Sequence, residues 1–350
     1  MATGIIQTRF GKVSGIPLQG KYEGITEFRG IPYAAPPVGD LRWKAPVDPA
    51  AWDGVRVCDT YAPMAMQDRM NGLAFEPYSS DFYWEGYPPC SEDCLYLNIT
   101  AKAIASGEKL PVFVWFHGGG LADGYSYEAV FDGSELARKG VIVVTVGQRL
   151  NLFGYLSLPQ LTAEQGGKSG NYGLMDEVKA LEWVRENIAA FGGDPDNITI
   201  GGQSGGTAKS GALATSPKAA GLVKRVINQS NLFWLRNYAT VADNEKNGRT
   251  YLESVGINPN LPLEELRKLD ARAFLGPKGS IGRYRTAMVH DGEYVAYPEQ
   301  TRNYEAYGAG IDYLVGSNYG EGALRGFGLV PEPFKDVADF YGYMKETLGD

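Results

Sequence analysis

Short apolar runs recur along the chain, and each is flanked by glycine or polar turn residues. Runs of this kind predict buried strands, and they cover residues 112–116, 141–146, 198–200, 223–227 and 313–315. Between the second and the third run, apolar residues at steps of three or four form one helical stripe, which consists of Leu174, Val178, Leu181, Val184 and Ile188. Strands that alternate with helices predict an α/β fold with a central, mostly parallel sheet.

The first hundred residues follow a different pattern. They are rich in aromatic residues and carry three closely spaced prolines, Pro32, Pro36 and Pro37. Alternating apolar positions that suit a half-buried strand occur at Leu95, Leu97 and Ile99. This part of the chain predicts a small N-terminal antiparallel sheet ahead of the main one.

Residues 232–310 mix helical pattern with loops and contain no strong strand signal. Such a segment suits a cap laid over the C-terminal edge of the sheet. The chain has no repeat, low-complexity tract or long block of charge that would mark a linker. We therefore expect one domain over residues 1–350, with the cap as part of it.

The composition limits the partners of the chain. Its 350 residues are 44% hydrophobic and carry a formal net charge of −8, so no basic surface is expected to attract nucleic acid or an anionic membrane. No apolar stretch reaches the roughly 18 residues of a membrane span, and the first residues lack the pattern of a secretory leader. We therefore expect a cytoplasmic protein without nucleic-acid or membrane partners.

The cysteines bear on redox state and on metal binding. Cys58, Cys90 and Cys94 are too few for the disulfide framework of a small secreted domain. No histidine cluster accompanies them, so they do not form a convincing zinc site. We expect reduced thiols and neither a metal nor an organic cofactor.

The strongest chemical signal is GQSGG at residues 202–206, a G-x-S-x-G motif between a predicted strand and a helix expected from about Thr207. A strand that turns so sharply into a helix crowds the backbone, so the outer glycines let the neighbouring segments approach while Ser204 is held above the sheet. The helix N-terminus favours developing negative charge, which predicts that Ser204 is a nucleophile for acyl transfer. A glycine-rich turn with an incidental serine is the alternative interpretation.

A second glycine motif, HGGG at residues 117–120, directly follows the predicted strand 112–116. Its glycines expose backbone N–H groups. We expect those of Gly119 and Gly120, together with that of Gly205 after the nucleophile, to bind the oxyanion formed in ester hydrolysis. A loop selected only for close packing is the alternative.

Five segments together resemble the type-B carboxylesterase family, which includes cholinesterases and bacterial para-nitrobenzyl esterases. They are FRGIPYA at 28–34, SEDCLYLN at 91–98, HGGG at 117–120, GNYGLMD at 170–176 and FGGDP at 191–195. They span nearly the whole N-terminal two thirds of the chain. The resemblance implies the α/β-hydrolase fold, with helices on both faces of the central sheet.

The resemblance also implies roles for single residues. Glu321, in the loop after the predicted strand 313–315, matches the acid of the family's triad; a solvated loop carboxylate is the alternative. Three aromatic residues match the entrance or the acyl pocket of relatives, although packing within their loops explains them equally well: Trp84, Phe233 and Trp234.

Two charged pairs match salt bridges in relatives and are predicted to be structural, namely Arg42 with Glu92 and Arg149 with Asp176. The chain departs from the family beside the nucleophile, where the family's glutamate is Gln203 and its alanine is Gly205. These changes keep the turn and remove a charge beside the site. The disulfide of many secreted relatives would join Cys94 to a position that is Ala65 or a neighbour here, which agrees with reduced thiols.

The largest departure is the missing base. Hydrolysis by serine needs a group that takes up the hydroxyl proton and returns it to the leaving group. His117 belongs to the glycine loop, and His290 matches a family segment that is not catalytic. Lys209 follows Ser204 by five residues and not by the three of S-x-x-K enzymes. In the family the histidine lies well beyond the acid, so we expect a C-terminal segment or a complementary chain to supply it.

Two classes of function remain open. The first is a serine carboxylesterase that hydrolyses small-molecule carboxylic esters through an acyl-enzyme. The second is a catalytically inactive binding or interaction protein on the same fold. The motifs leave the natural ester and the choice between esterase, lipase and amidase undecided, because they specify chemistry and not specificity.

Overall fold

The computed structural model describes residues 4–67, 88–103, 109–230, 237–276, 284–318 and 345. Its centre is an eight-stranded sheet in the order β15-β12-β11-β9-β10-β8-β4-β3. Five of these strands run parallel to one another, and they confirm the positions of the five predicted strands: β9 (Leu110–Phe116), β10 (Ile142–Val146), β11 (Gly193–Gln203), β12 (Arg225–Gln229) and β15 (Asp312–Gly316). The predicted burial is wrong for β15, which lies at the edge of the sheet and is largely exposed.

The remaining three strands of the sheet are antiparallel: β3 (Ile16–Pro17), β4 (Ile25–Pro32) and β8 (Tyr96–Lys102). The alternating segment after residue 95 therefore belongs to the main sheet, where Ile99 pairs with Val144 of β10. The alternating pattern correctly predicts a strand, but it does not show which sheet that strand joins.

A small N-terminal sheet is present, but it is mixed and not purely antiparallel. Its strands are β1 (Ile6–Gln7), β2 (Lys12–Ser14) and β5 (Val55–Val57). β1 and β2 form an antiparallel hairpin, whereas β5 returns through a long connection and pairs parallel to β2. A further parallel pair joins β6 (Met64–Ala65) and β7 (Cys90–Ser91).

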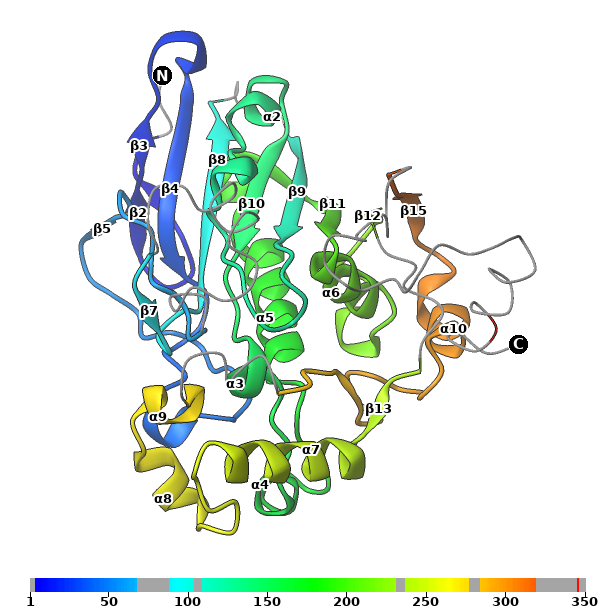
Figure 1. Cartoon of the computed structure of the whole chain (residues 1–350). Helices are drawn as coiled ribbons and strands as arrows, with labels where there is room; N and C mark the ends of the chain where they lie inside the picture. The colour runs from blue at the N-terminus through cyan, green and yellow to red at the C-terminus, as the bar shows by residue number, and fades with distance from the viewer. Residues whose placement is uncertain are drawn as a thin grey trace.

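One face of the main sheet is covered by α5 (Tyr172–Asn187) and α6 (Gly205–Ala214), as Figure 1 shows. The predicted stripe of α5 is buried along its whole length. On β9, alternate residues Val112, Val114 and Phe116 belong to the same core, as expected for a strand with side-chain period two. The core therefore holds β11 and α6, the two elements on either side of the G-x-S-x-G motif, in a fixed relation.

The opposite face carries the short helix α2 (Ser134–Arg138) and a broad depression of about 850 Å³. Apolar residues that line it include Phe113 and Trp115 of β9 and Ile227 of β12. Leu314 of β15 also lines it and is 65% exposed.

The region predicted as a cap is described over residues 237–276 and 284–310. Besides a π-helix (Tyr304–Gly308), it forms four α-helices and two short strands. These elements are β13 (Ala239–Thr240), α7 (Val241–Ser254), α8 (Leu263–Lys268), α9 (Ala271–Leu275), β14 (Val289–His290) and α10 (Gln300–Asn303). In Figure 1, α7, α8 and α9 lie beyond the end of the sheet toward which β9 runs. A second apolar cluster packs these helices onto α3 (Asn151–Tyr155) and α4 (Pro159–Glu164).

No helix in the described ranges is both long enough and apolar enough to cross a membrane.

Candidate active site

Ser204 lies at the sharp turn between β11 and α6, with an exposed side chain. Its backbone angles are φ 55° and ψ −116°, a combination that non-glycine residues rarely adopt and that stores strain. The amide of Ser204 donates to the carbonyl oxygen of Gln229 on β12 at 2.9 Å. The strained residue is thus tied to the neighbouring strand.

The two glycines around Ser204 are required by the packing. A Cβ atom on Gly202 would lie 2.3 Å from the carbonyl carbon of Gly206, and one on Gly206 would lie 2.1 Å from the carbonyl oxygen of Phe116. These distances are far below van der Waals contact, so neither position accommodates a side chain. The crowding expected from the sequence is therefore present on both sides of the turn.

The loop of residues 117–120 lies directly against this turn. A Cβ atom on Gly118 would be 3.8 Å from the Cβ of Ser204, and one on Gly205 would be 2.4 Å from the amide nitrogen of Gly120. Gly119 and Gly120 have φ values of 84° and 66°, in the region that favours glycine. Among the described residues, their two amide groups have no hydrogen-bond acceptor.

Thr207, which sequence reasoning did not single out, ties the first turn of α6 to both adjacent strands. Its hydroxyl lies within hydrogen-bond distance of the carbonyl oxygens of Gly202 (3.1 Å) and Gln229 (2.8 Å), and the residue is fully buried. A hydroxyl residue three positions after the serine, in a helix rich in small residues, is the sequence signal for this contact.

The two predicted structural ion pairs are formed. Arg42 Nε contacts Glu92 Oε1 at 2.6 Å, and Arg149 Nη2 contacts Asp176 Oδ1 at 2.6 Å. The side chains of Arg149 and Asp176 are 3% and 0% exposed, so this pair is desolvated. Both pairs join distant segments of the chain.

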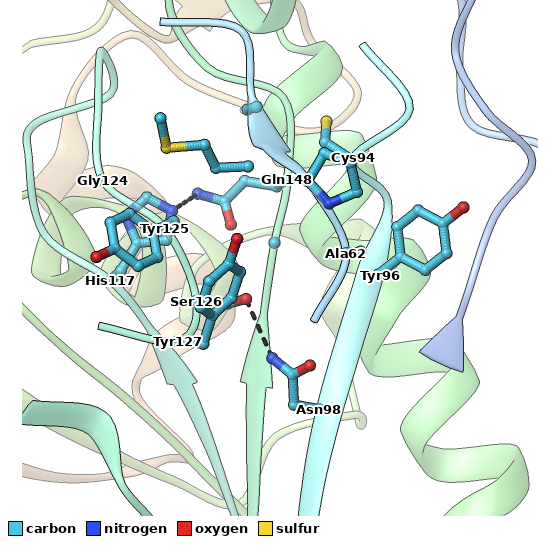
Figure 2. Close-up of a pocket in the computed structure, with 14 residues that line it drawn as sticks. Ala62, Cys94, Tyr96, Asn98, His117, Gly124, Tyr125, Ser126, Tyr127 and Gln148 are labelled. Carbon is cyan, nitrogen blue, oxygen red and sulfur yellow. Dashed lines mark hydrogen bonds between the residues drawn. The ribbon is translucent and has the colours of Figure 1, made fainter. Parts of the chain in front are cut away.

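Each histidine ring contacts a backbone carbonyl. Nδ1 of His117 donates to the carbonyl oxygen of Gly118 at 2.8 Å, and Nε2 of His290 donates to that of Ala296 at 3.1 Å. The other ring nitrogen of His117 lies 2.8 Å from the side-chain amide of Gln148, a contact drawn as a dashed line in Figure 2. Lys209 is fully buried and donates from Nζ to the carbonyl oxygen of His117 at 3.0 Å.

Figure 2 also shows a small cavity of about 10 Å³ beside His117 and Gln148, which is about the volume that one water molecule needs. Ala65 and Cys94 both line it, which agrees with the expected proximity of these two positions. Asn98, a further lining residue, donates to Ser126 at 3.2 Å. All three cysteines of the chain are described and are free thiols.

Four predicted site residues lie outside the described residues, so the structure does not place them: Trp84, Phe233, Trp234 and Glu321. The depression on the sheet face reaches the site, because Gly118, Gly119 and Gln203 line it. Ser230, which precedes the undescribed residues 231–236, also lines it and has φ 61°. Within the described ranges, no group of three or more acidic, histidine or cysteine residues is arranged to hold a metal ion.

The mostly parallel sheet, the strained serine between strand and helix, and the glycine loop beside it define an α/β-hydrolase. The chain belongs to the carboxylesterase family, whose model matches residues 2–341.

Two curated relatives and a solved structure show the extent of the similarity. The fumonisin B1 esterase of Sphingopyxis macrogoltabida is 36% identical over 98% of this chain and 60% of its own length. The para-nitrobenzyl esterase of Bacillus subtilis (strain 168) is 36% identical over 91% of this chain and 63% of its own length. A solved PNB esterase has a TM-score of 0.81 at 32% identity, covering 100% of this chain and 69% of that chain. The chain thus spans less than two thirds of the length of these two curated relatives.

Proposed function

We propose that the protein is a serine carboxylesterase that hydrolyses carboxylic esters through an acyl-enzyme on Ser204. The observation that carries the proposal is the juxtaposition of the strained Ser204 with the loop that holds Gly119 and Gly120. An exposed serine at a helix N-terminus, next to amides that lack an acceptor among the described residues, is the arrangement that acyl transfer requires. Membership of the carboxylesterase family supports the same chemistry.

In the proposed mechanism, the hydroxyl oxygen of Ser204 attacks the ester carbonyl carbon while a base takes up its proton. The carbonyl oxygen becomes an oxyanion and accepts hydrogen bonds from the amides of Gly119, Gly120 and Gly205. The positive end of the α6 dipole adds to this stabilisation. Collapse of the tetrahedral intermediate expels the alcohol, which receives the proton, and water then releases the acid from the acyl-enzyme. No metal or organic cofactor takes part.

We assign the base to a histidine in a C-terminal part of the protein beyond residue 350 or in a complementary chain, and its acidic partner to Glu321. Two observations support this assignment. The curated relatives are longer than this chain, and both histidines present here already contact backbone carbonyls. We propose that the same additional part covers the apolar face around Phe113, Trp115 and Leu314.

The proposed substrate is a small-molecule ester, bound between the glycine loop and a cap formed by residues 232–310. Trp84, Phe233 and Trp234 are the proposed pocket residues, and the proposed location is the cytoplasm. The alternative, a binding protein without catalysis, is favoured only by the absence of a base among residues 1–350.

An organophosphate ester probe followed by mass spectrometry tests the proposal. The full-length protein, a fragment of residues 1–350 and the Ser204→Ala variant of each are treated side by side. Labelling of Ser204 in the full-length protein, with little in the fragment, is the expected result. Full esterase activity of the fragment overturns the assignment of the base, and an inert Ser204 in every form favours the binding protein.

A further inference from the structure

The side chain of Lys209 is fully buried although the residue follows the exposed Ser204 by only five positions on α6. Its Nζ donates to the carbonyl oxygen of His117 at 3.0 Å. An ammonium group has only donors, so the Gln148 atom at 2.7 Å from it is the amide oxygen, and the amide nitrogen then donates to Val146 at 2.9 Å. Lys209 therefore contacts both the backbone carbonyl of His117 and the side chain of Gln148, which lies against the His117 ring.

These contacts restrict two successive peptide groups of the glycine loop. Lys209 fixes the carbonyl of His117, and Nδ1 of His117 fixes the carbonyl of Gly118 at 2.8 Å. Nε2 of His117 lies 2.8 Å from the same Gln148 oxygen that Lys209 contacts, as Figure 2 shows for this pair, so the ring makes both contacts as hydrogen bonds only with a proton on each nitrogen. In a planar trans peptide, the carbonyl and the following N–H point in opposite directions. Fixing the carbonyl of Gly118 therefore directs the amide of Gly119 away from the buried network.

The next peptide group is fixed in the same way. The carbonyl oxygen of Gly119 accepts hydrogen bonds from the amides of Ala122 and Asp123 at 3.3 and 3.2 Å. The amide of Gly120 consequently points away from these donors. The carbonyls of His117, Gly118 and Gly119 thus all accept hydrogen bonds from within the protein. The amides of Gly119 and Gly120 point the other way, toward a ligand.

Burial disfavours the charged form of Lys209, and nearby acidic groups offset this only in part. Burial lowers the pKa of Lys209 to about 8, and the carboxylates of Glu177, Glu128 and Asp123 oppose this shift. Glu177, on the adjacent α5, is fully buried, and neither of its oxygens has a hydrogen-bond partner within the described part of the chain. At neutral pH the ammonium is therefore retained behind the loop.

We propose that Lys209 is a positioning residue that orients the amides of Gly119 and Gly120 for oxyanion binding by holding His117 and Gln148. Its kinetic consequence rests on the proposed esterase function, whereas its structural consequence does not. The family resemblance assigns no role to this position, and the spacing from Ser204 does not suit a base. The contribution of Lys209 to the reaction is therefore geometric and is transmitted through the loop.

The test compares Lys209→Met in the full-length protein with a matched control on the same helix, Ser210→Ala. Methionine keeps most of the side-chain length but cannot donate to His117. Ser210 is equally buried, but its hydroxyl bonds Asn228 on β12 at 2.7 Å and does not contact the loop. Gln148→Met is the second variant, since it leaves the Lys209–His117 bond intact if Lys209→Met fails to fold.

Hydrogen exchange gives a readout that is independent of activity. We expect the amides of Ala122 and Asp123 to lose about tenfold or more of their protection in Lys209→Met, to lose less in Gln148→Met, and to be unchanged in Ser210→Ala. Hydrolysis of p-nitrophenyl acetate gives the second readout. Because misaligned donors weaken transition-state binding, kcat should fall about 10- to 100-fold in Lys209→Met with KM little changed.

The outcomes separate the two proposals. Altered exchange in a protein without esterase activity supports the positioning role and counts against the proposed function. Normal exchange and normal kcat in both Lys209→Met and Gln148→Met overturn the positioning role and leave the proposed function intact. A lower melting temperature with unchanged exchange in the loop and unchanged kcat also overturns it, because it assigns Lys209 to stability alone.

Discussion

Gly205 packs against Gly120 so closely that a Cβ atom on Gly205 would lie 2.1 Å from the carbonyl oxygen of Gly120. The glycine loop therefore rests directly on the first residue of α6. The type-B family that the chain resembles has alanine at this position. In this chain a methyl group there requires one of the two backbone segments to move, and the loop is the one that carries the proposed oxyanion donors.

Replacing Gly205 with alanine should consequently displace the loop. We expect kcat/KM for p-nitrophenyl acetate to fall about 10- to 100-fold, because a shift of about 1 Å in a donor is enough for such a loss. The matched control is Gly310→Ala, since a Cβ at Gly310 meets no atom within 4 Å. Equal activity of Gly205→Ala and the unmodified protein would show that the loop accommodates the methyl group without loss of geometry.

The buried carboxyl of Glu177 makes stability depend on pH. Burial raises the pKa of Glu177 from 4.5 to about 8, against the opposing effect of Lys209. Between these values the folded protein holds a proton that the unfolded chain has released, so the free energy of unfolding falls as the pH rises. The stabilising contribution of the protonated carboxyl is complete below pH 4.5 and is lost as the pH rises through about 8.

Glu177→Gln should abolish this dependence, because an amide resembles the protonated carboxyl and does not titrate. Relative to the unmodified protein, the variant should gain about 1.4 kcal/mol for each pH unit between about pH 5 and about pH 8. Urea unfolding over this range measures the difference. Parallel stability curves for the two proteins would contradict the assignment of the proton to Glu177.

Asp176→Asn tests the buried ion pair with Arg149. Removal of the carboxylate leaves a desolvated guanidinium without its partner, so we expect a loss of about 3 to 5 kcal/mol in the free energy of unfolding. Denaturant titration at neutral pH measures the loss. The control is Asp48→Asn, whose carboxylate is 39% exposed and pairs with Arg9, and which should change stability by less than about 1 kcal/mol. Similar losses for both variants would mean that burial does not set the strength of the Arg149 pair.

Thr207→Val tests the anchoring of the turn at Ser204. Valine keeps the shape of threonine but removes the hydroxyl that contacts Gly202 and Gln229, at a cost of roughly 1 to 3 kcal/mol. We expect slower labelling of Ser204 by an organophosphate probe in the full-length protein. Thr215→Val is the control at the C-cap of α6, because the hydroxyl of Thr215 bonds Gly211 within the helix. An equal effect of both substitutions would assign the change to the helix and not to the turn.

The parts of the fold that follow from local sequence were predicted well. All five runs became strands and the stripe from Leu174 became α5, because apolar periodicity reports which side chains are buried. Burial was predicted wrongly for the run 313–315, where Leu314 and Val315 are exposed. The motif at Ser204 was recognisable since its glycines are dictated by contacts within a few residues. Which strands pair with one another could not be predicted in the same way. Nothing in the local sequence shows that the segment containing Ile99 pairs with β10.

The network behind the glycine loop could not be predicted for a similar reason. Lys209, Gln148 and His117 come from α6, the segment after β10 and the end of β9, so only the tertiary structure brings them together. In the sequence, Lys209 is a charged residue on a helix and suggests a solvent-facing side chain. Its burial depends on acceptors that lie more than 50 residues away along the chain.

The left-handed backbone of Ser204 also bears on the choice between an enzyme and a binding protein. A non-glycine residue in such a conformation costs about 1 to 3 kcal/mol, and glycine would relieve most of that strain. A protein that only binds its partner would be more stable with glycine at position 204, between two glycines that already form the turn. Serine is the less stable choice at this position, and the proposed nucleophilic role of its hydroxyl accounts for keeping it there.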